Sequence, residues 1–190
     1  MAKKNLRIAW GITGAGDLLP KLIEIMKELA QNENLKIRIF LSKAGKTVID
    51  MYKFWEDLET IGKITVEKDA NTPFLAGSLQ LRKYDFFLIA PSTANTTAKI
   101  VRGIADTLIT NSLSQGIKGG CPVYILPVDQ EFGTTVTILP SGKELKLTMR
   151  PIDVNNVERL RQMQGITVLK KPEDIRDIVR KNATLDAFYN

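Results

Sequence analysis

The sequence contains no histidine and only one cysteine, Cys121. Without histidine, the chain cannot form a histidine-ligated metal site or a Ser-His-Asp triad, and no side chain has an ordinary pKa near neutrality. A single cysteine excludes an internal disulfide and a four-cysteine metal site within one chain. An iron–sulfur centre would therefore have to come from a partner protein.

Long hydrophobic runs are also absent. The apolar stretch Phe86–Pro91 is far shorter than the roughly 20 residues that a membrane-spanning helix needs. The first residues resemble no secretory signal, so we expect a cytoplasmic protein without a membrane segment. Lysine and arginine outnumber aspartate and glutamate by 27 to 21. These basic residues are scattered, which favours anion-attracting surface rather than a nucleic-acid site.

Short apolar strands alternate with amphipathic helices along the chain. This order predicts an α/β fold with a doubly wound, mainly parallel sheet of the Rossmann or flavodoxin type. We expect a single domain over residues 1–190. Two alternating segments predict a β-hairpin insertion. The expected strands are Leu6–Trp10, Ile37–Leu41, Ile64–Val66, Asp85–Ala90, Pro122–Leu126 and Ile166–Leu169, with Thr134–Leu139 and Glu144–Met149 in the hairpin.

Helical spacing of apolar residues predicts the helices between these strands. Asp17 is expected to cap the first helix, and Pro20 suits its first turn. The second helix is expected to carry Val48, Met51, Tyr52 and Trp55 along one side. We expect Met26, Met51 and Met163 to lie in the core, together with Cys121 as a small buried hydrophobe.

Polar or small residues follow four of the expected strands. They are GITGAG (Gly11–Gly16), SKAG (Ser42–Gly45), PSTAN (Pro91–Asn95) and LPVDQ (Leu126–Gln130). In open parallel sheets, ligands bind beyond the carboxyl ends of the strands, where free helix amides accept anions. The arrangement therefore favours a phosphate-bearing ligand, although a glycine-rich turn can also be purely structural.

The spacing in GITGAG departs from the dinucleotide fingerprint GxGxxG. In addition, Ser42 and Lys43 stand after the second strand, where a ribose-binding acid would be expected. NAD is therefore disfavoured. A hydroxyl and an ammonium group suit the terminal phosphate of a mononucleotide better.

The segment Ala90–Asn111, APSTANTTAKIVRGIADTLITN, resembles the PASANT signature and following helices of the homo-oligomeric flavin-containing cysteine decarboxylase superfamily. That superfamily also includes flavin prenyltransferases and phosphopantothenoylcysteine decarboxylases. The resemblance implies FMN as cofactor. It places cofactor contacts at Gly14, Ala15, Gly16, Ser42, Ser92, Thr93, Ala94, Asn95, Ala105 and Asp106.

Several of these residues have purely structural interpretations. Ser42, Ser92 or Thr93 could cap helices, Asn95 could form a turn, and Asp106 could start a helix. Trp10, just before the first loop, could stack near a flavin or could simply be a buried aromatic residue.

The departures from the family bear on the reaction. Decarboxylating members resemble one another in a histidine near the flavin and a PxMNxxMW clamp, whereas this chain has no histidine and reads LPVDQEFG there. The Arg-Glu-Thr segment of the prenyltransferases is missing too. The family motifs that this chain does retain resemble those of the archaeal branch, which consists of archaeoflavoproteins and dihydromethanopterin reductases.

This branch implies electron transfer from a donor such as ferredoxin or reduced flavin to an acceptor, including a pterin. Alternatives are a diverged decarboxylase or flavin prenyltransferase, and a binding module for another phosphorylated ligand. Asn95, Thr96 and Lys99 are candidate hydrogen-bond donors to the reduced ring. Asp129 is a conceivable proton relay, although a solvated turn is the preferred interpretation, and no catalytic residue is assigned.

The resemblance also implies a homo-oligomer built from trimers, with flavin at the subunit interface. The hairpin Thr134–Met149 is the candidate for an intersubunit or substrate-covering element.

Overall fold

The computed structural model describes residues 5–185. Its strands are β1 (Leu6–Ile12), β2 (Leu35–Leu41), β3 (Lys63–Val66), β4 (Phe86–Ser92), β5 (Val123–Pro127), β6 (Thr134–Ile138), β7 (Glu144–Thr148) and β8 (Ile166–Val168). Its helices are α1 (Leu19–Ala30), α2 (Lys43–Tyr52), α3 (Trp55–Ile61), α4 (Leu75–Gln80), α5 (Ala94–Val101), α6 (Leu108–Lys118), α7 (Pro151–Arg161) and α8 (Asp174–Leu185).

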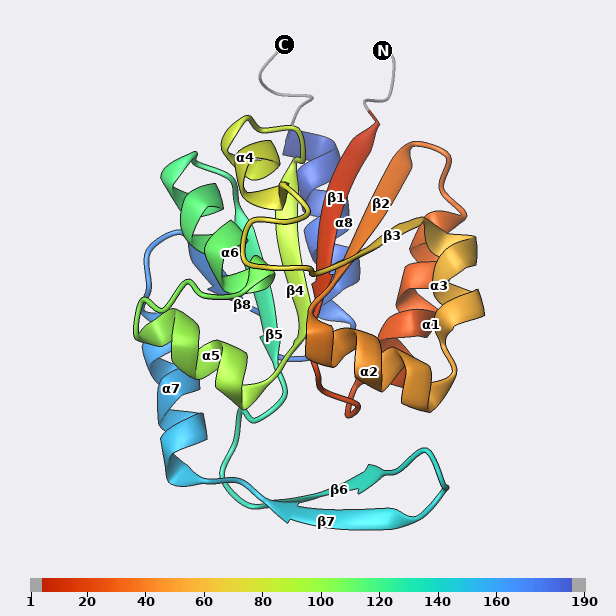
Figure 1. Cartoon of the computed structure of the whole chain (residues 1–190), viewed down its shortest axis with the longest axis vertical. Helices are drawn as coiled ribbons and strands as arrows, with labels where there is room; N and C mark the ends of the chain where they lie inside the picture. Colours follow the sequence, from red (N-terminus) through yellow and green to blue (C-terminus); the bar gives the residue numbers. More distant parts are fainter. Residues whose placement is uncertain (1–4, 186–190) are drawn as a thin grey trace.

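The main sheet is six-stranded and parallel, with the strand order β3-β2-β1-β4-β5-β8. The chain winds outward from β1 to β3 and then returns to β4 on the other side of β1 (Figure 1). The direction of winding therefore reverses between β1 and β4. The helices that follow these two strands, α1 and α5, cover opposite faces of the sheet, and such a reversal is where open parallel sheets bind ligands. The predicted doubly wound α/β fold is confirmed.

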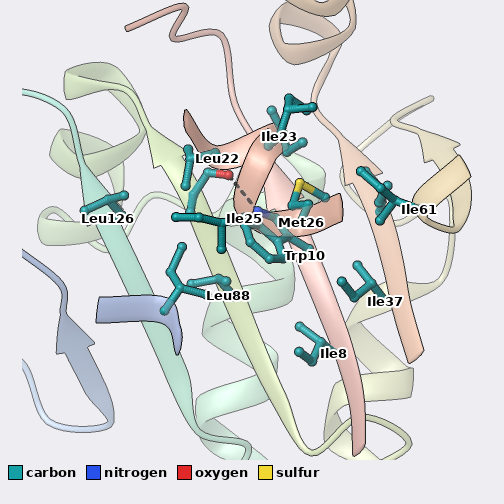
Figure 2. Packing of buried hydrophobic residues seen from close by; sticks show 14 of the residues in the cluster. Ile8, Trp10, Leu22, Ile23, Ile25, Met26, Ile37, Ile61, Leu88 and Leu126 are labelled. Atoms are coloured by element: carbon teal, nitrogen blue, oxygen red, sulfur yellow. Dashed lines mark hydrogen bonds between the residues drawn. The ribbon is translucent and has the colours of Figure 1, made fainter. Parts of the chain in front are cut away.

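Both faces of this sheet are buried, which explains why its central strands are apolar almost throughout. Ile8 and Trp10 in β1 pack on the face covered by α1, α2, α3 and α8, whereas Ala9 packs on the face covered by α4 to α7. Trp10 is fully buried, and its indole Nε1 donates to the carbonyl oxygen of Ala90 in β4 at 2.7 Å (Figure 2). Trp10 therefore belongs to the core and holds β1 to β4.

Two predictions about helix ends are wrong. Asp17 does not cap α1: the N-cap position is Leu18, and no side chain caps the helix, although Pro20 occupies the first turn as expected. The helix expected to reach from Val48 to Trp55 ends at Tyr52, because Lys53 adopts a left-handed conformation (φ 59°). Trp55 instead begins α3.

The third error follows from this break. Met51 lies in the last turn of α2 and is 56% exposed, so it is not a core residue. Met26 is fully buried, and Met163 packs against the core from its edge, as expected. Helical spacing alone did not show that the apolar face stops before Met51.

Strands β6 and β7 pair antiparallel as a separate two-stranded sheet, which confirms the predicted hairpin. The hairpin lies beyond the carboxyl ends of the main strands, below the body of the molecule in Figure 1. None of the helices within residues 5–185 has the length and apolar character that crossing a bilayer requires.

Candidate functional site

A cleft of about 480 Å³ opens at the carboxyl ends of β1 and β4, where the winding reverses. It is bounded by the first loop, the start of α5, the loop after β5 and the hairpin. Its lining residues are Gly14, Ala15, Gly16, Asp17, Tyr52, Thr93, Ala94, Asn95, Val128, Asp129, Thr137, Leu139, Leu147 and Arg150. This volume is in the range of sites for small molecules and cofactors.

Thr13 joins the two loops on either side of the cleft. Its backbone amide and its hydroxyl both donate to the carbonyl oxygen of Pro91, at 3.2 and 2.8 Å. The same hydroxyl accepts a hydrogen bond from the amide of Thr93 at 2.9 Å. Because Thr13 is almost fully buried, these bonds are shielded from water and hold the first loop against the start of α5.

The first turn of α5 presents free donors to the cleft. Thr93 is the N-cap, and its Oγ1 accepts from the amide of Thr96 at 3.1 Å. Within residues 5–185, the amides of Ala94 and Asn95 donate to no protein acceptor. Unsatisfied amides at a helix N-terminus favour an anion, because the helix dipole adds to their partial positive charge.

The first loop packs too closely against α2 to accept larger residues. A Cβ atom at Gly14 would lie 2.6 Å from the Cβ of Ala44, and one at Gly16 would lie 2.6 Å from the hydroxyl of Tyr52. These glycines thus allow the backbone of the loop to run along the edge of the cleft. Together with Ala15 and Ala94, they give that wall a surface of small residues.

The opposite wall comes from the hairpin and from α2. Leu139 and Leu147 line the cleft with Thr137, and the hydroxyl of Tyr52 donates to the carbonyl oxygen of Ile138 at 3.0 Å. The ring of Tyr52 stacks on Phe54, with centroids 6.1 Å apart. Tyr52 therefore connects the hairpin to the body of the protein next to Gly16.

Acidic groups gather at one end of the cleft. Arg150 and Asp153 form a two-point ion pair, with Nε to Oδ2 at 2.7 Å and Nη2 to Oδ1 at 2.8 Å. Partial burial raises the pKa of the Asp129 carboxyl, and the negative charges of Asp153 and Asp17 raise this pKa further. Asp129 is thus a half-buried acid at the edge of the cleft rather than a solvated turn residue.

The N-terminus of α2 is occupied by protein groups. The Ser42 hydroxyl accepts from the amide of Gly45 at 2.9 Å, so Ser42 is a helix cap. The buried Glu67, which follows β3, accepts from the amide of Lys43 at 2.9 Å through Oε2 and from the amide of Leu108 at 2.8 Å through Oε1. This one carboxylate therefore accepts backbone hydrogen bonds from the first turns of both α2 and α6.

The structure brings together six of the predicted cofactor contacts: Gly14, Ala15, Gly16, Thr93, Ala94 and Asn95 all line the cleft. The other four predicted contacts do not line the cleft. Ser42 caps α2, and Ser92 is fully buried with its hydroxyl 3.3 Å from that of Thr97. Ala105 and Asp106 lie exposed between α5 and α6. Cofactor contacts at all ten positions stay predictions.

Lys99 was a candidate donor to a flavin ring. Its ammonium group pairs with both oxygens of Asp106 at 2.8 Å, and this hydrogen bond lowers the pKa of the Asp106 carboxyl. Thr96 accepts a hydrogen bond from the Thr93 hydroxyl at 3.0 Å. Of the three candidate donors, Asn95 lines the cleft.

Sequence reasoning missed several residues that shape the site. Thr13, Tyr52, Glu67, Leu139, Leu147 and Arg150 were not selected. Thr13 lies inside GITGAG, and Glu67 directly follows a strand, so their positions at strand ends were available signals. The hairpin that carries Leu139 and Leu147 was predicted as a candidate covering element, but no local pattern indicated which of its residues face the cleft.

A second cleft of about 490 Å³ adjoins the first, and Asp17 and Val128 line both. Gln130 lines the second cleft, but its side-chain amide is used structurally. It donates to the carbonyl oxygens of Pro127 and Lys170 at 2.9 and 3.1 Å and accepts from Arg161 at 2.9 Å. Gln130 thus fixes the loop after β5 against α7 and the end of β8.

Residues 1–185 match the Flavoprotein family. The chain belongs to this family. The match spans every strand and helix that the structure describes, including the cleft and the hairpin. Together with the relatives described next, this match confirms the predicted membership of the flavin-containing decarboxylase superfamily, in its branch similar to dihydromethanopterin reductase.

Three similar proteins cover nearly the whole chain. An uncharacterised protein of Methanocaldococcus jannaschii is 58% identical over 178 residues, covering 93% of this chain and 96% of that protein. Dihydromethanopterin reductase (acceptor) of the same organism is 30% identical over 233 residues, covering 90% of this chain and 94% of the reductase. The crystal structure of Burkholderia xenovorans DmrB with FMN, a cubic protein cage for redox transfer, has a TM-score of 0.81 at 31% identity, covering 97% of this chain and 99% of DmrB.

Proposed function

We propose that this chain is an FMN-binding redox flavoprotein that passes electrons from a donor, such as ferredoxin or reduced flavin, to an acceptor of the dihydropterin type. One observation carries the proposal: a cleft lined by the start of α5 lies at the β1–β4 reversal, in a chain of which 97% is similar to a protein solved with FMN. The redox function and the cofactor predicted from the sequence agree with these similarities.

The residues of the cleft fit FMN in chemistry and in size. The unpartnered amides of Ala94 and Asn95, with the polar backbone of Gly14–Gly16, suit a phosphate group. Small residues on one wall and Leu139 and Leu147 on the other suit a flat, largely apolar ring. A cleft of about 480 Å³ is large enough to hold most of such a molecule.

When bound, FMN supplies hydride or single-electron transfer through its isoalloxazine ring. The residues of the chain position the flavin and set the polarity of its surroundings. Thr13 fixes the distance between the first loop and α5, and Asn95 presents its side-chain amide to the cleft, where it can bond to the ring or its substituents. The hairpin residues Leu139 and Leu147 present apolar side chains to one side of the cleft.

The competing function is a diverged decarboxylase or flavin prenyltransferase. Decarboxylating members of the family resemble one another in a histidine near the flavin. This chain has no histidine, so another residue would have to take over that role. The loop LPVDQEFG places Asp129 at the cleft and commits Gln130 to structural hydrogen bonds. These features favour redox chemistry.

The electron donor is proposed to be a separate molecule. The alignment with the M. jannaschii reductase runs over 233 residues, whereas this chain has 190, so the reductase contains residues without a counterpart here. A single cysteine leaves no means to bind an iron–sulfur cluster within one chain. The excess of basic residues suits an acidic donor protein such as ferredoxin.

We also propose that the whole chain acts as one cytoplasmic domain and assembles into homo-oligomers built from trimers. Exposed Ala105 and Asp106 are then available to the flavin of a neighbouring copy. Deletion of the hairpin Thr134–Met149 tests its part in this arrangement: either the mass of the assembly or the retention of flavin is expected to change. If neither changes, the hairpin has neither role.

The visible spectrum of the purified protein tests the central proposal. FMN should co-purify, or bind to the colourless protein in about one equivalent per chain, and the bound flavin should be reduced anaerobically by ferredoxin or reduced flavin. Flavin-dependent decarboxylation or prenyl transfer, without reduction by any donor, would support the competing function. Failure to bind FMN would favour a binding module for another phosphorylated ligand.

A further inference from the structure

Negatively charged groups outnumber positively charged groups at the end of the cleft near α7. Three carboxylates, those of Asp17, Asp129 and Asp153, lie close enough to interact, and Arg150 is the cation among them. Arg150 gives its two-point ion pair to Asp153, whose side chain is 7% exposed. In the part of the chain that the structure describes, the carboxyl of Asp129 has no hydrogen bond or ion pair.

The backbone on both sides of Asp129 is held in place. The amide of Val128 donates to the carbonyl oxygen of Ser92 at 3.1 Å, which ties the loop to the end of β4. On the other side, the side-chain amide of Gln130 donates to the carbonyl oxygens of Pro127 and Lys170 and accepts from Arg161, which anchors this residue. A half-buried carboxyl on a fixed backbone thus lies at the edge of the cleft, without the counter-charge that its neighbour Asp153 has.

We propose that Asp129 is the acid that protonates the acceptor during its reduction. This assignment rests on the proposed function, because it concerns the second half of the same reaction. The acceptor class is a compound with a carbon–nitrogen double bond, such as the N5=C6 imine of a 7,8-dihydropterin.

The reaction balances with the groups named. The imine carbon accepts a hydride, which carries two electrons, from N5 of the reduced flavin. The nitrogen–hydrogen bond of the flavin breaks and the flavin is oxidised, while a carbon–hydrogen bond forms and the π electron pair of the imine moves onto its nitrogen. The nitrogen takes the proton of the Asp129 carboxyl, so that an oxygen–hydrogen bond breaks and a nitrogen–hydrogen bond forms. The carboxylate then regains a proton from water.

The surroundings of Asp129 suit an acid. Partial burial and the charges of Asp153 and Asp17 raise its pKa, and Arg150 opposes this effect. Since Arg150 is already paired with Asp153, its positive charge is largely compensated. A larger fraction of Asp129 therefore stays protonated than for an aspartate in water.

The test compares two acceptors on the flavin-loaded protein: 7,8-dihydropterin, which needs a proton on nitrogen, and ferricyanide, which takes single electrons and no proton. Asp129→Asn should lower the rate of dihydropterin reduction at neutral pH by about 100-fold or more. Flavin content and the rate with ferricyanide should stay within about twofold of the unaltered protein. Asp129→Glu should restore part of the dihydropterin rate.

The pH profile provides a second readout. With the unaltered protein, dihydropterin reduction should fall as pH rises and Asp129 loses its proton, whereas Asp129→Asn should lack this fall. Glu131→Gln, an exposed substitution two residues away, is the matched control and should behave like the unaltered protein.

Three results would overturn the assignment. The first is an unchanged dihydropterin rate in Asp129→Asn, and the second is an equal loss with both acceptors, which indicates a displaced flavin. The third is a protein that reduces ferricyanide but not dihydropterin, because Asp129 then has no nitrogen to protonate. A protein that binds no flavin would instead contradict the proposed function itself.

Discussion

The hydroxyl of Thr13 accepts the amide hydrogen of Thr93 at 2.9 Å and donates its own hydrogen to Pro91 at 2.8 Å. One buried side chain thus joins the loop after β1 to the loop after β4, at the place where the sheet reverses its winding. The two walls that we propose to hold FMN depend on this connection.

Thr13→Val should therefore weaken both the fold and cofactor binding. Valine has the same shape but leaves the Thr93 amide without an acceptor, at a cost of about 1–3 kcal/mol in the free energy of unfolding. Denaturant titration and FMN affinity measure the two effects. Thr13→Ser keeps the hydroxyl and should lose much less; equal losses for serine and valine would show that the hydrogen bonds are not responsible.

Glu67→Ala should destabilise the protein without touching the cleft. The substitution leaves the amides of Lys43 and Leu108 without their acceptor at the starts of α2 and α6. We expect a loss of about 2 kcal/mol or more in the free energy of unfolding. An unsatisfied buried donor, here the Leu108 amide, costs about 1–3 kcal/mol, and the loss of the part-buried bond to Lys43 adds to this cost. The exposed Glu59→Gln serves as control. A stability equal to that of the control would contradict the role of Glu67.

Asp129→Asn should stabilise the folded protein at neutral pH. Because burial raises the pKa of Asp129 in the fold, the folded state holds its proton more tightly than the unfolded chain does. The contribution of Asp129 to stability is greatest below its ordinary pKa of 3.8 and is lost as pH rises through the raised value. The advantage of asparagine should thus grow from acid to neutral pH in denaturant titrations. A constant or shrinking advantage would be the opposite of this expectation.

Tyr52→Phe should loosen the hairpin while leaving the body intact. Phenylalanine keeps the stacking on Phe54 but removes the hydrogen bond to the carbonyl oxygen of Ile138. Limited proteolysis should cut the hairpin faster, and FMN should dissociate faster, with a change of about 1 kcal/mol or less in global stability. Unchanged proteolysis and dissociation would show that the hairpin is held by other contacts.

Cys121 should be nearly inert in the folded protein. It is buried, and this burial raises the pKa of its thiol to about 11, so that only about one molecule in a thousand carries the reactive thiolate at pH 8. Alkylation by iodoacetamide, followed by mass spectrometry, should be slow in the native protein and rapid in denaturant. Rapid labelling of the native protein would contradict this environment.

The sequence predicted the parts of the fold that follow from local pattern. The alternation of strands and helices, the hairpin and the convergence of the first loop with PSTAN were all recognisable, because period and turn residues encode them. The break after Tyr52 was not, since a non-glycine residue, Lys53, adopts the left-handed conformation. Residues such as Tyr52 and Leu147 reach the cleft through tertiary contacts, which no local pattern encodes.

Ser42 illustrates a different limit. A hydroxyl after a strand and before a helix suits both a phosphate contact and a helix cap, and the two uses look identical in a sequence. The structure shows the cap, with Glu67 beside it on the same helix terminus. The sequence did not show that Glu67, which is distant along the chain, lies at this helix terminus.

The hairpin β6–β7 forms a two-stranded sheet of its own and shares no strand ladder with the main sheet. Its sequence can therefore change during evolution without altering the registers that hold the core together. A single scaffold can then acquire new substrate preferences by exchange of this appendage, while the edge that we propose to hold FMN is inherited unchanged.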